Sequence, residues 1–290
     1  MSNEVVKYHN ELNKLSMRDW TPEEMDFFFS IVWKVKNKGV RRVEIGTDEL
    51  KSLANFSQKN NTRFEQTLKR LVDHILELRT IVITKKGTRF SMKGCPFFTE
   101  FNFEWEKDLS EMNGYVQVSE HFQYFVNELK ANFTSWELKE FTQLRSTYAK
   151  TAYRHLKQYR TKGERVFDIE EFKMLFGIPK SYRAADINRR VFKPILTELK
   201  PYFLDLKITP VKKRTHGNPI IEYKFTFHPT LPEKWDEEKY DKKKLATSQR
   251  VKRKKNANNP TWYDDKETHQ ASDELVQQAL EVQKSRKEQQ

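Results

Sequence analysis

The chain has 290 residues, a length that favours two domains, and a formal net charge of +13, which favours a polyanionic partner, nucleic acid before membrane. A single cysteine, Cys95, excludes an internal disulfide framework and fits a reducing compartment. No apolar run approaches the roughly 18 residues of a membrane span. The first residues lack a signal-peptide pattern, so we expect a cytoplasmic protein.

Capping patterns mark the helices of the first half. Thr21-Pro22-Glu23-Glu24 combines an N-cap threonine, a proline at the first helical position and an acid at the third, and apolar spacing continues this helix to Val35. Thr47 before two acids begins a second helix. The other predicted elements are a third, basic helix, strands at residues 81–84, 97–105 and 115–118, with a loop near Gly94, and a helix at about 121–130.

The second half shows a similar alternation. Thr134 and Glu137 match a capping box, and apolar residues at helical spacing predict one long helix from Thr134 to about Tyr159. A short helix at 169–176, a helix starting near Tyr182 and a hairpin of residues 203–209 and 220–227 follow. After Pro232 the chain is so polar and charged that it cannot bury enough apolar surface to fold alone.

The order of elements occurs twice. Residues 43–90 and 165–227 both read strand, helix, helix, strand, at an offset of about 120 residues, which indicates a duplicated domain. A helix–turn–helix followed by a β-hairpin is the winged-helix pattern. We therefore predict an α+β fold with two tandem winged-helix domains, residues 1–133 and 134–230. A basic, largely disordered tail at 231–290 follows, with one weak helical stretch at 272–284.

The helix that begins near Tyr182 is the strongest candidate for reading DNA. At 100° per residue, Ile187, Val191, Phe192, Ile195 and Leu199 share one arc. The opposite arc holds Tyr182, Arg183, Asp186, Arg189, Arg190 and Lys193. Asn188 falls on the apolar side and is excluded. A helix with a basic face suits the major groove, where arginines can fork to guanine and Lys193 can meet a phosphate. The alternative is a solvated amphipathic face. Pro194 is expected to break a hydrogen bond and kink this helix.

The corresponding helix of the first repeat is weaker. Its basic residues facing away from the apolar stripe are Lys59, Arg63, Lys69 and Arg70, but Asp73 and Glu77 follow on that face. We therefore expect backbone contacts there rather than base reading. The two hairpin tips carry Lys85, Lys86 and Arg89, and Lys212, Lys213 and Arg214, which suit phosphate or the minor groove. Plain solubility explains loop lysines about as well.

The sequence offers no catalytic constellation. It has no phosphate-binding Gly-Lys-Ser or Gly-Lys-Thr motif, no closely spaced histidine pair and no zinc-ligand spacing. Tyr148 and Tyr153 lie at helical spacing and are interpreted as core or groove residues rather than nucleophiles. We therefore predict no enzymatic activity, no metal and no cofactor.

Three segments carry a resemblance to a known family: residues 12–20, the helix at 138–159 with Tyr148, Arg154 and Tyr159, and the motif at 189–199 with its unusual Pro194. Over residues 5–230 the chain resembles the initiator replication proteins of theta-replicating, iteron-type plasmids, Gram-positive type. The resemblance implies that the second domain reads repeated origin sites, while the first grips phosphates and supports dimerisation. It also implies that monomers open the origin, that dimers repress the protein's own promoter, and that host replication proteins are partners in a bacterial cytoplasm.

Other functions remain open from the sequence. A transcriptional regulator could use the same two domains without a role in replication, and a nickase or primase would be an enzyme. The tail could raise affinity for any duplex through its positive charge, or it could dock a host replication protein.

Overall fold

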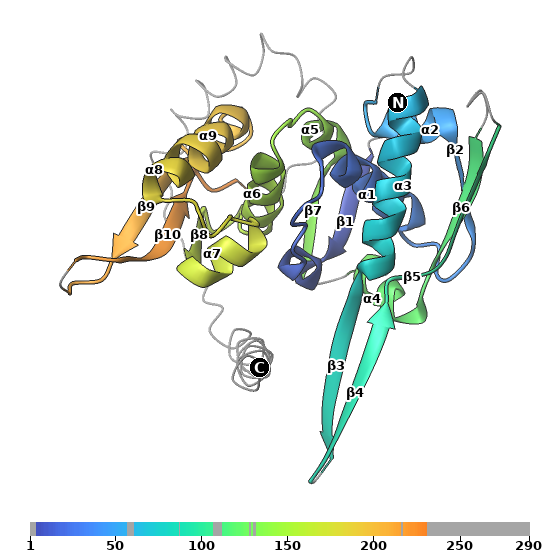
Figure 1. Cartoon of the computed structure of the whole chain (residues 1–290), viewed down its shortest axis with the longest axis horizontal. Helices are drawn as coiled ribbons and strands as arrows, with labels where there is room; N and C mark the ends of the chain where they lie inside the picture. Colours follow the sequence, from blue (N-terminus) through green and yellow to red (C-terminus); the bar gives the residue numbers. More distant parts are fainter. Residues whose placement is uncertain are drawn as a thin grey trace. The chain divides into compact units, whose positions relative to one another are not determined.

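The computed structural model describes residues 4–56, 61–86, 88–106, 112–127, 129, 132–215 and 217–230, without the side chains of 80–84, 86 and 112 (Figure 1). The described residues fall within one packed unit. The predictions for Lys59, for the Lys86 side chain and for the tail at 231–290 lie outside them.

The N-terminal half contains a central helix, three further helices and a set of antiparallel strands. Its elements are β1 (Val5–His9), the 3-10 turn η1 (Asn10–Lys14), α1 (Pro22–Val35), β2 (Val43–Gly46), α2 (Thr47–Leu53), α3 (Asn61–Glu77), β3 (Arg79–Lys86), β4 (Arg89–Pro96), β5 (Phe98–Trp105), β6 (Met112–Val118) and α4 (Glu120–Val126). Strands β2, β6 and β5 form one sheet in that order, and β3 pairs with β4 in a separate ribbon.

Helix α1 is the centre of this half. The predicted capping box is confirmed: the Thr21 hydroxyl accepts from the Glu24 amide, and the Glu24 carboxylate accepts from the Thr21 amide at 2.9 Å. Apolar side chains cover most sides of the helix, including Phe27, Phe28 and Phe29, all fully buried. A helix that is apolar all round packs inside a core rather than on its surface.

Three predicted boundaries of this half are corrected. The expected strand at 81–84 runs from 79 to 86, and Gly94, expected in a loop, lies inside β4 opposite Ile81. The backbone at Gly94 is not left-handed, so it continues the ladder. Helix α4 ends at Val126 rather than near residue 130, because Asn127 takes up an extended conformation.

The long helix predicted from Thr134 to Tyr159 is wrong in its first third. The segment instead forms β7 (Phe133–Glu137), α5 (Leu138–Thr142) and α6 (Thr147–Gln158). Strand β7 pairs with β1, with Val6 opposite Trp136, and this pairing outweighs the local capping signal. Helix α6 is capped by Ser146, whose hydroxyl accepts from the Ala149 amide.

The C-terminal half repeats the order of strand, helix, helix and hairpin. Its elements are β8 (Glu164–Asp168), α7 (Ile169–Leu175), α8 (Ala184–Asp186), the π-helical turn η2 (Ile187–Phe192), α9 (Lys193–Leu199), β9 (Lys207–Lys212) and β10 (Ile220–Thr226), with sheet order β8-β10-β9. The Asp168 side chain caps α7 as expected. Strand β9 starts at 207 rather than 203, because Asp205 adopts a turn conformation with φ of 57°.

Helix α6 joins the two halves. On one side the buried Lys150 ammonium donates to the Asp26 carboxylate of α1 at 2.6 Å and to the Phe141 carbonyl at 2.8 Å. On the other side the Glu198 carboxylate of α9 accepts from the amides of Arg145 and Ser146, just before α6, at 2.8 and 3.2 Å. The predicted recognition segment of the second half therefore contacts a helix that is anchored in the first half.

Candidate nucleic-acid interface

Pro194 shapes the helix that carries the candidate base-reading residues. In a regular α-helix its ring would clash with the carbonyl of Arg190, and it has no N–H to donate. A π-helical turn over Ile187–Phe192 precedes Pro194. Pro194 then lies in the first turn of α9, where the absence of an N–H donor loses no helical hydrogen bond. The disturbance expected from Pro194 is thus present as a widened turn.

The widened turn changes which residues face solvent. The predicted apolar stripe is confirmed, because Ile187, Val191, Phe192, Ile195 and Leu199 are all buried. Arg189, Arg190 and Lys193 are exposed, as is Arg183. Asn188 is also exposed, so its predicted place on the apolar side is wrong. A π-helix has more residues per turn than an α-helix, so a step of 100° per residue misplaces Asn188.

The arginines of η2 are held loosely. Arg189 Nη2 lies 3.4 Å and Arg190 Nε 3.8 Å from the same Asp186 oxygen, and the two arginine side chains are 68% and 53% exposed. Ion pairs this exposed contribute little to stability. Both guanidinium groups can therefore exchange Asp186 for another acceptor at small cost.

Two tyrosines position Arg190. Its guanidinium carbon lies 5.4 Å from the centre of the Tyr182 ring, and Tyr182 in turn lies beside Tyr148. Burial, followed by the neighbouring Tyr182, raises the pKa of Tyr148 to about 12. Tyr148 therefore stays a neutral phenol that supports Tyr182, in keeping with its interpretation as a groove residue.

The second wing extends the positive surface. Lys212 ends β9 opposite Ile220, and the exposed Lys213 and Arg214 begin the connection to β10. The Lys213 amide donates to the Pro219 carbonyl at 2.9 Å, which fixes the start of the turn. Within the described part of the chain, no ion pair involves these three side chains.

The cations of α3 already have carboxylate partners. Arg63 pairs with Glu23, Lys69 Nζ lies 2.6 Å from Glu65, and Arg70 Nε lies 2.8 Å from the buried Glu24. All three basic side chains are exposed, so the sequence placed them on the correct face. Helix α1 supplies the carboxylates of two of these pairs, which no pattern along α3 itself predicts. In the first wing, the exposed Lys85 lies 5.3 Å from the centre of the Phe90 ring.

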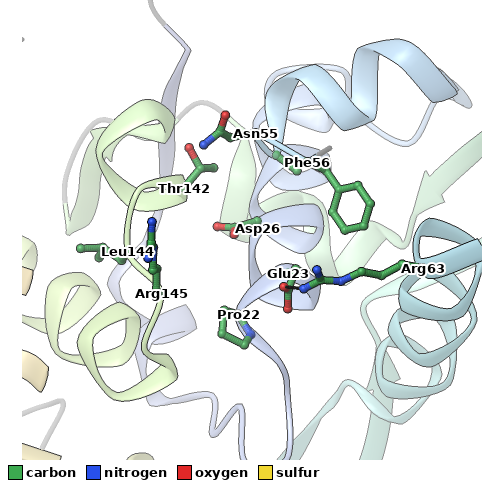
Figure 2. A pocket seen from close by; sticks show the side chains of 10 residues that line it. Pro22, Glu23, Asp26, Asn55, Phe56, Arg63, Thr142, Leu144 and Arg145 are labelled. Carbon is green, nitrogen blue, oxygen red and sulfur yellow. Dashed lines mark hydrogen bonds and ion pairs between the residues drawn. The ribbon is translucent and has the colours of Figure 1, made fainter. Parts of the chain in front are cut away.

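A cleft of about 480 Å³ lies between α1, the end of α2, α3 and the connection from α5 to α6 (Figure 2). Arg63 reaches Glu23 across one side of it, and Arg145 lies on another. Burial raises the pKa of Asp26, at its base, to about 7, although Lys150 beside it acts in the opposite direction. Acids and bases alternate here, so the cleft lacks the single sign of charge that would suit a phosphate.

No group of three or more His, Cys, Asp or Glu side chains in the described ranges is placed to hold a metal ion. No helix among the same residues is long and apolar enough to span a membrane.

Two helix–turn–helix units, each followed by a β-hairpin, define a tandem winged-helix protein. Sequence comparison agrees: the family profile described as "Initiator Replication protein, WH1" matches residues 5–157, and that described as "Initiator Rep protein, WH2" matches residues 168–227. The chain belongs to the initiator replication protein family. The predicted fold and the resemblance stated from the sequence are confirmed.

Individual relatives support this assignment. The chain is 32% identical over 240 residues to a protein of Bifidobacterium longum (strain NCC 2705) described as "Probable replication protein rep", covering 80% of this chain and 75% of the relative. Among solved structures, the Pi initiator protein in complex with iteron DNA superposes with a TM-score of 0.57 at 12% identity, covering 80% of this chain and all of that one. At this identity the structural match establishes the shared fold.

Proposed function

We propose that this protein binds repeated double-stranded sites at a replication origin and promotes opening of that origin in a bacterial cytoplasm. The observation that carries the proposal is the surface of η2 and the second wing. There, exposed and loosely paired guanidinium groups lie on a winged-helix recognition segment. The Pi initiator, which shares the fold, was crystallised with iteron DNA.

The two halves have different roles in this proposal. Residues 134–230 read base edges through Arg189 and Arg190, with Tyr182, Arg183 and Lys193 around them and Lys212, Lys213 and Arg214 on phosphates. Residues 1–133 contact phosphates through α3 and the first wing, and support dimerisation. Dimers then repress the protein's own promoter, while monomers act at the origin. Three paired cations on α3 favour this division, because a cation already held by a carboxylate is less free to reach a base edge.

The proposed activity includes no strand cleavage and no nucleotide hydrolysis. Tyr153 is fully buried and donates to Glu140, and burial raises its pKa well above the ordinary value. Tyr148 is half-buried beside Tyr182, and burial raises its pKa to about 12. Incubating the protein with supercoiled DNA and a divalent metal tests this: nicking that depends on either tyrosine would contradict it.

Footprinting on the DNA that flanks the coding sequence tests the proposed function directly. We expect protection of several similar, regularly spaced sites. Supplied in trans, the protein should then allow a plasmid carrying those sites to replicate. Protected sites without replication would instead indicate a transcriptional regulator, and absence of any preferred site would contradict both.

The tail at 231–290 is proposed to add affinity without adding discrimination, because its basic residues attract phosphate in any sequence. Truncation after Pro232 should weaken binding to specific and random duplexes equally, and most at low salt. Unchanged binding together with failed replication would point to a host protein as the partner of the tail.

A further inference from the structure

The first wing has an unusual composition for a surface hairpin. Strands β3 and β4 and their turn, residues 79–96, contain five cations and no acid: Arg79, Lys85, Lys86, Arg89 and Lys93. Among the described strands the two pair only with each other, and the ribbon projects beyond the neighbouring helices (Figure 1). A lone two-stranded ribbon is marginally stable in water, so a binding partner would stabilise it.

The two faces of β4 differ. Residues alternate between faces along a strand, so Phe90 and Met92 lie on one face and Arg89, Ser91 and Lys93 on the other. Phe90 is 71% and Met92 57% exposed, and Phe90 is the most exposed large apolar side chain in the described part of the chain. The Lys85 ammonium, 5.3 Å from the Phe90 ring, keeps a positive charge beside this apolar pair.

These properties favour DNA over a second copy of the chain as the occupant of the apolar face. Two ribbons that each carry five cations and no acid would repel one another, whereas phosphates would attract both. Apolar side chains flanked by cations suit the minor groove, where Phe and Met of other proteins wedge between base pairs and unstack them. A basic ribbon without apolar side chains would only grip the backbone.

The second wing is also basic but exposes no large apolar side chain in its described residues, so it serves as an internal reference. Its tip carries Lys212, Lys213 and Arg214, but its aromatic side chains, Tyr223 and Phe225, are buried in the core. No aromatic or Met side chain is exposed in the described residues of β9 and β10. Positive charge is therefore common to both wings, while the exposed apolar face belongs to the first.

We propose that the β3–β4 ribbon is a wedge: it enters the minor groove beside the bound site, and Phe90 and Met92 unstack a base step there. The inference rests on the proposed function, since the protein must first bind a duplex. It adds a physical route from binding to strand opening, because the separation of strands begins where stacking is lost.

The test compares the full-length protein with the F90S/M92S variant on linear duplexes that contain a footprinted site. Wild type should make thymines next to the footprint reactive to permanganate, and the variant should lower that reactivity about fivefold or more. The variant should bind the matched duplex more weakly, yet bind a duplex with a two-base mismatch at that step as tightly as wild type does. Equal binding to the mismatched duplex also shows that the variant is folded.

Two further variants distinguish the effect of Phe90 and Met92 from the effects of another exposed apolar side chain and of the positive charge on the ribbon. M174S removes an exposed methionine on α7 and should leave reactivity unchanged. R89A/K93A should weaken binding to all duplexes while reactivity for each bound molecule stays constant. The wedge is wrong if F90S/M92S keeps full reactivity, or if it alters only the sedimentation of the free protein, which would reveal an interface between copies. If wild type itself finds no preferred site, the proposed function fails first.

Discussion

The two predicted recognition segments, α3 and η2 with α9, have similar positions in their domains but differ in how their cations are paired. Each exposed cation considered on α3 has a carboxylate partner, and two of those carboxylates belong to α1. On η2, two arginines share one aspartate at 3.4 and 3.8 Å. A count of basic residues therefore does not distinguish the two segments, whereas the pairing of each cation does.

The backbone differs as well. Helix α3 is regular over Asn61–Glu77, whereas the second segment is a π-turn followed by a short α-helix. The π-turn exposes three successive polar residues, Asn188, Arg189 and Arg190. A regular helix would turn one of them towards the core, so the widened turn gives the second segment a broader polar surface.

Helix α6 links the two halves, and the largest predicted effect comes from removing its buried ion pair with α1. Lys150→Met removes one partner of the buried pair between α6 and α1 and leaves the Asp26 carboxyl without its cation. Loss of one member of a buried pair costs about 3–5 kcal/mol, so we expect a fall of that size in the free energy of unfolding. Urea denaturation of the full chain measures it.

The control for this prediction is Lys173→Met, whose exposed pair with Glu170 should contribute less than about 0.5 kcal/mol. Adding Asp26→Asn to Lys150→Met should recover part of the loss, because the uncompensated carboxylate is then removed. A loss below about 1 kcal/mol for Lys150→Met would mean that α6 is not anchored through this pair.

The next largest effect should fall on base preference. Replacing Arg189 or Arg190 with Ala should cost about 1–3 kcal/mol on the preferred site and leave random duplex almost unchanged. Lys69→Ala on α3 is the matched control, and it should weaken all sequences alike. Competition binding with specific and random duplexes measures both, and the assignment of η2 as the reading segment fails if site preference survives both arginine changes.

Asn188 sharpens the comparison, because only the π-turn exposes it. Asn188→Ala should leave unfolding unchanged and lower discrimination at one base pair by no more than about 1–3 kcal/mol, since an asparagine amide can pair with adenine. Thr62→Ala, at an exposed position of α3, should leave discrimination unchanged. A drop in stability for Asn188→Ala would instead place this side chain on the packed side.

Particular elements show which features of the structure could be predicted from the sequence and which could not. Apolar periodicity identified both stripes, and capping residues placed the starts of α1 and α7, because those signals are local. The strand at 133–137 was missed because its partner, β1, lies more than a hundred residues away in the chain. Asn188 was missed because Pro194 acts on the turn before it, which a fixed angular step ignores.

Tertiary partners limited the prediction of the site in the same way. The sequence predicted the exposure of Arg63, Lys69 and Arg70 on the outer face of α3. It did not predict that packing would bring Glu23 beside Arg63 and Glu24 beside Arg70. The apolar face of the first wing was equally invisible, since Gly94 suggested a loop where β4 continues. Charge patterns along one element predict exposure, while charge compensation depends on neighbours from other elements.

The smallest predicted effect concerns the pairing of a single cation on α3, without any change in the backbone. Glu65→Gln removes the i,i+4 partner of Lys69 without changing the cation, so α3 should come closer to η2 in its attraction for phosphate. Affinity for any duplex should rise roughly two- to fivefold at low salt, since an exposed pair of this kind is worth at most about 1 kcal/mol. The slope of log K against log salt should steepen by about 0.9 if the freed ammonium reaches one additional phosphate.

Glu170→Gln on α7, which frees Lys173 in the same manner, is the matched control and should change neither the affinity nor the salt slope. An unchanged salt slope for Glu65→Gln would show that Lys69 does not approach DNA.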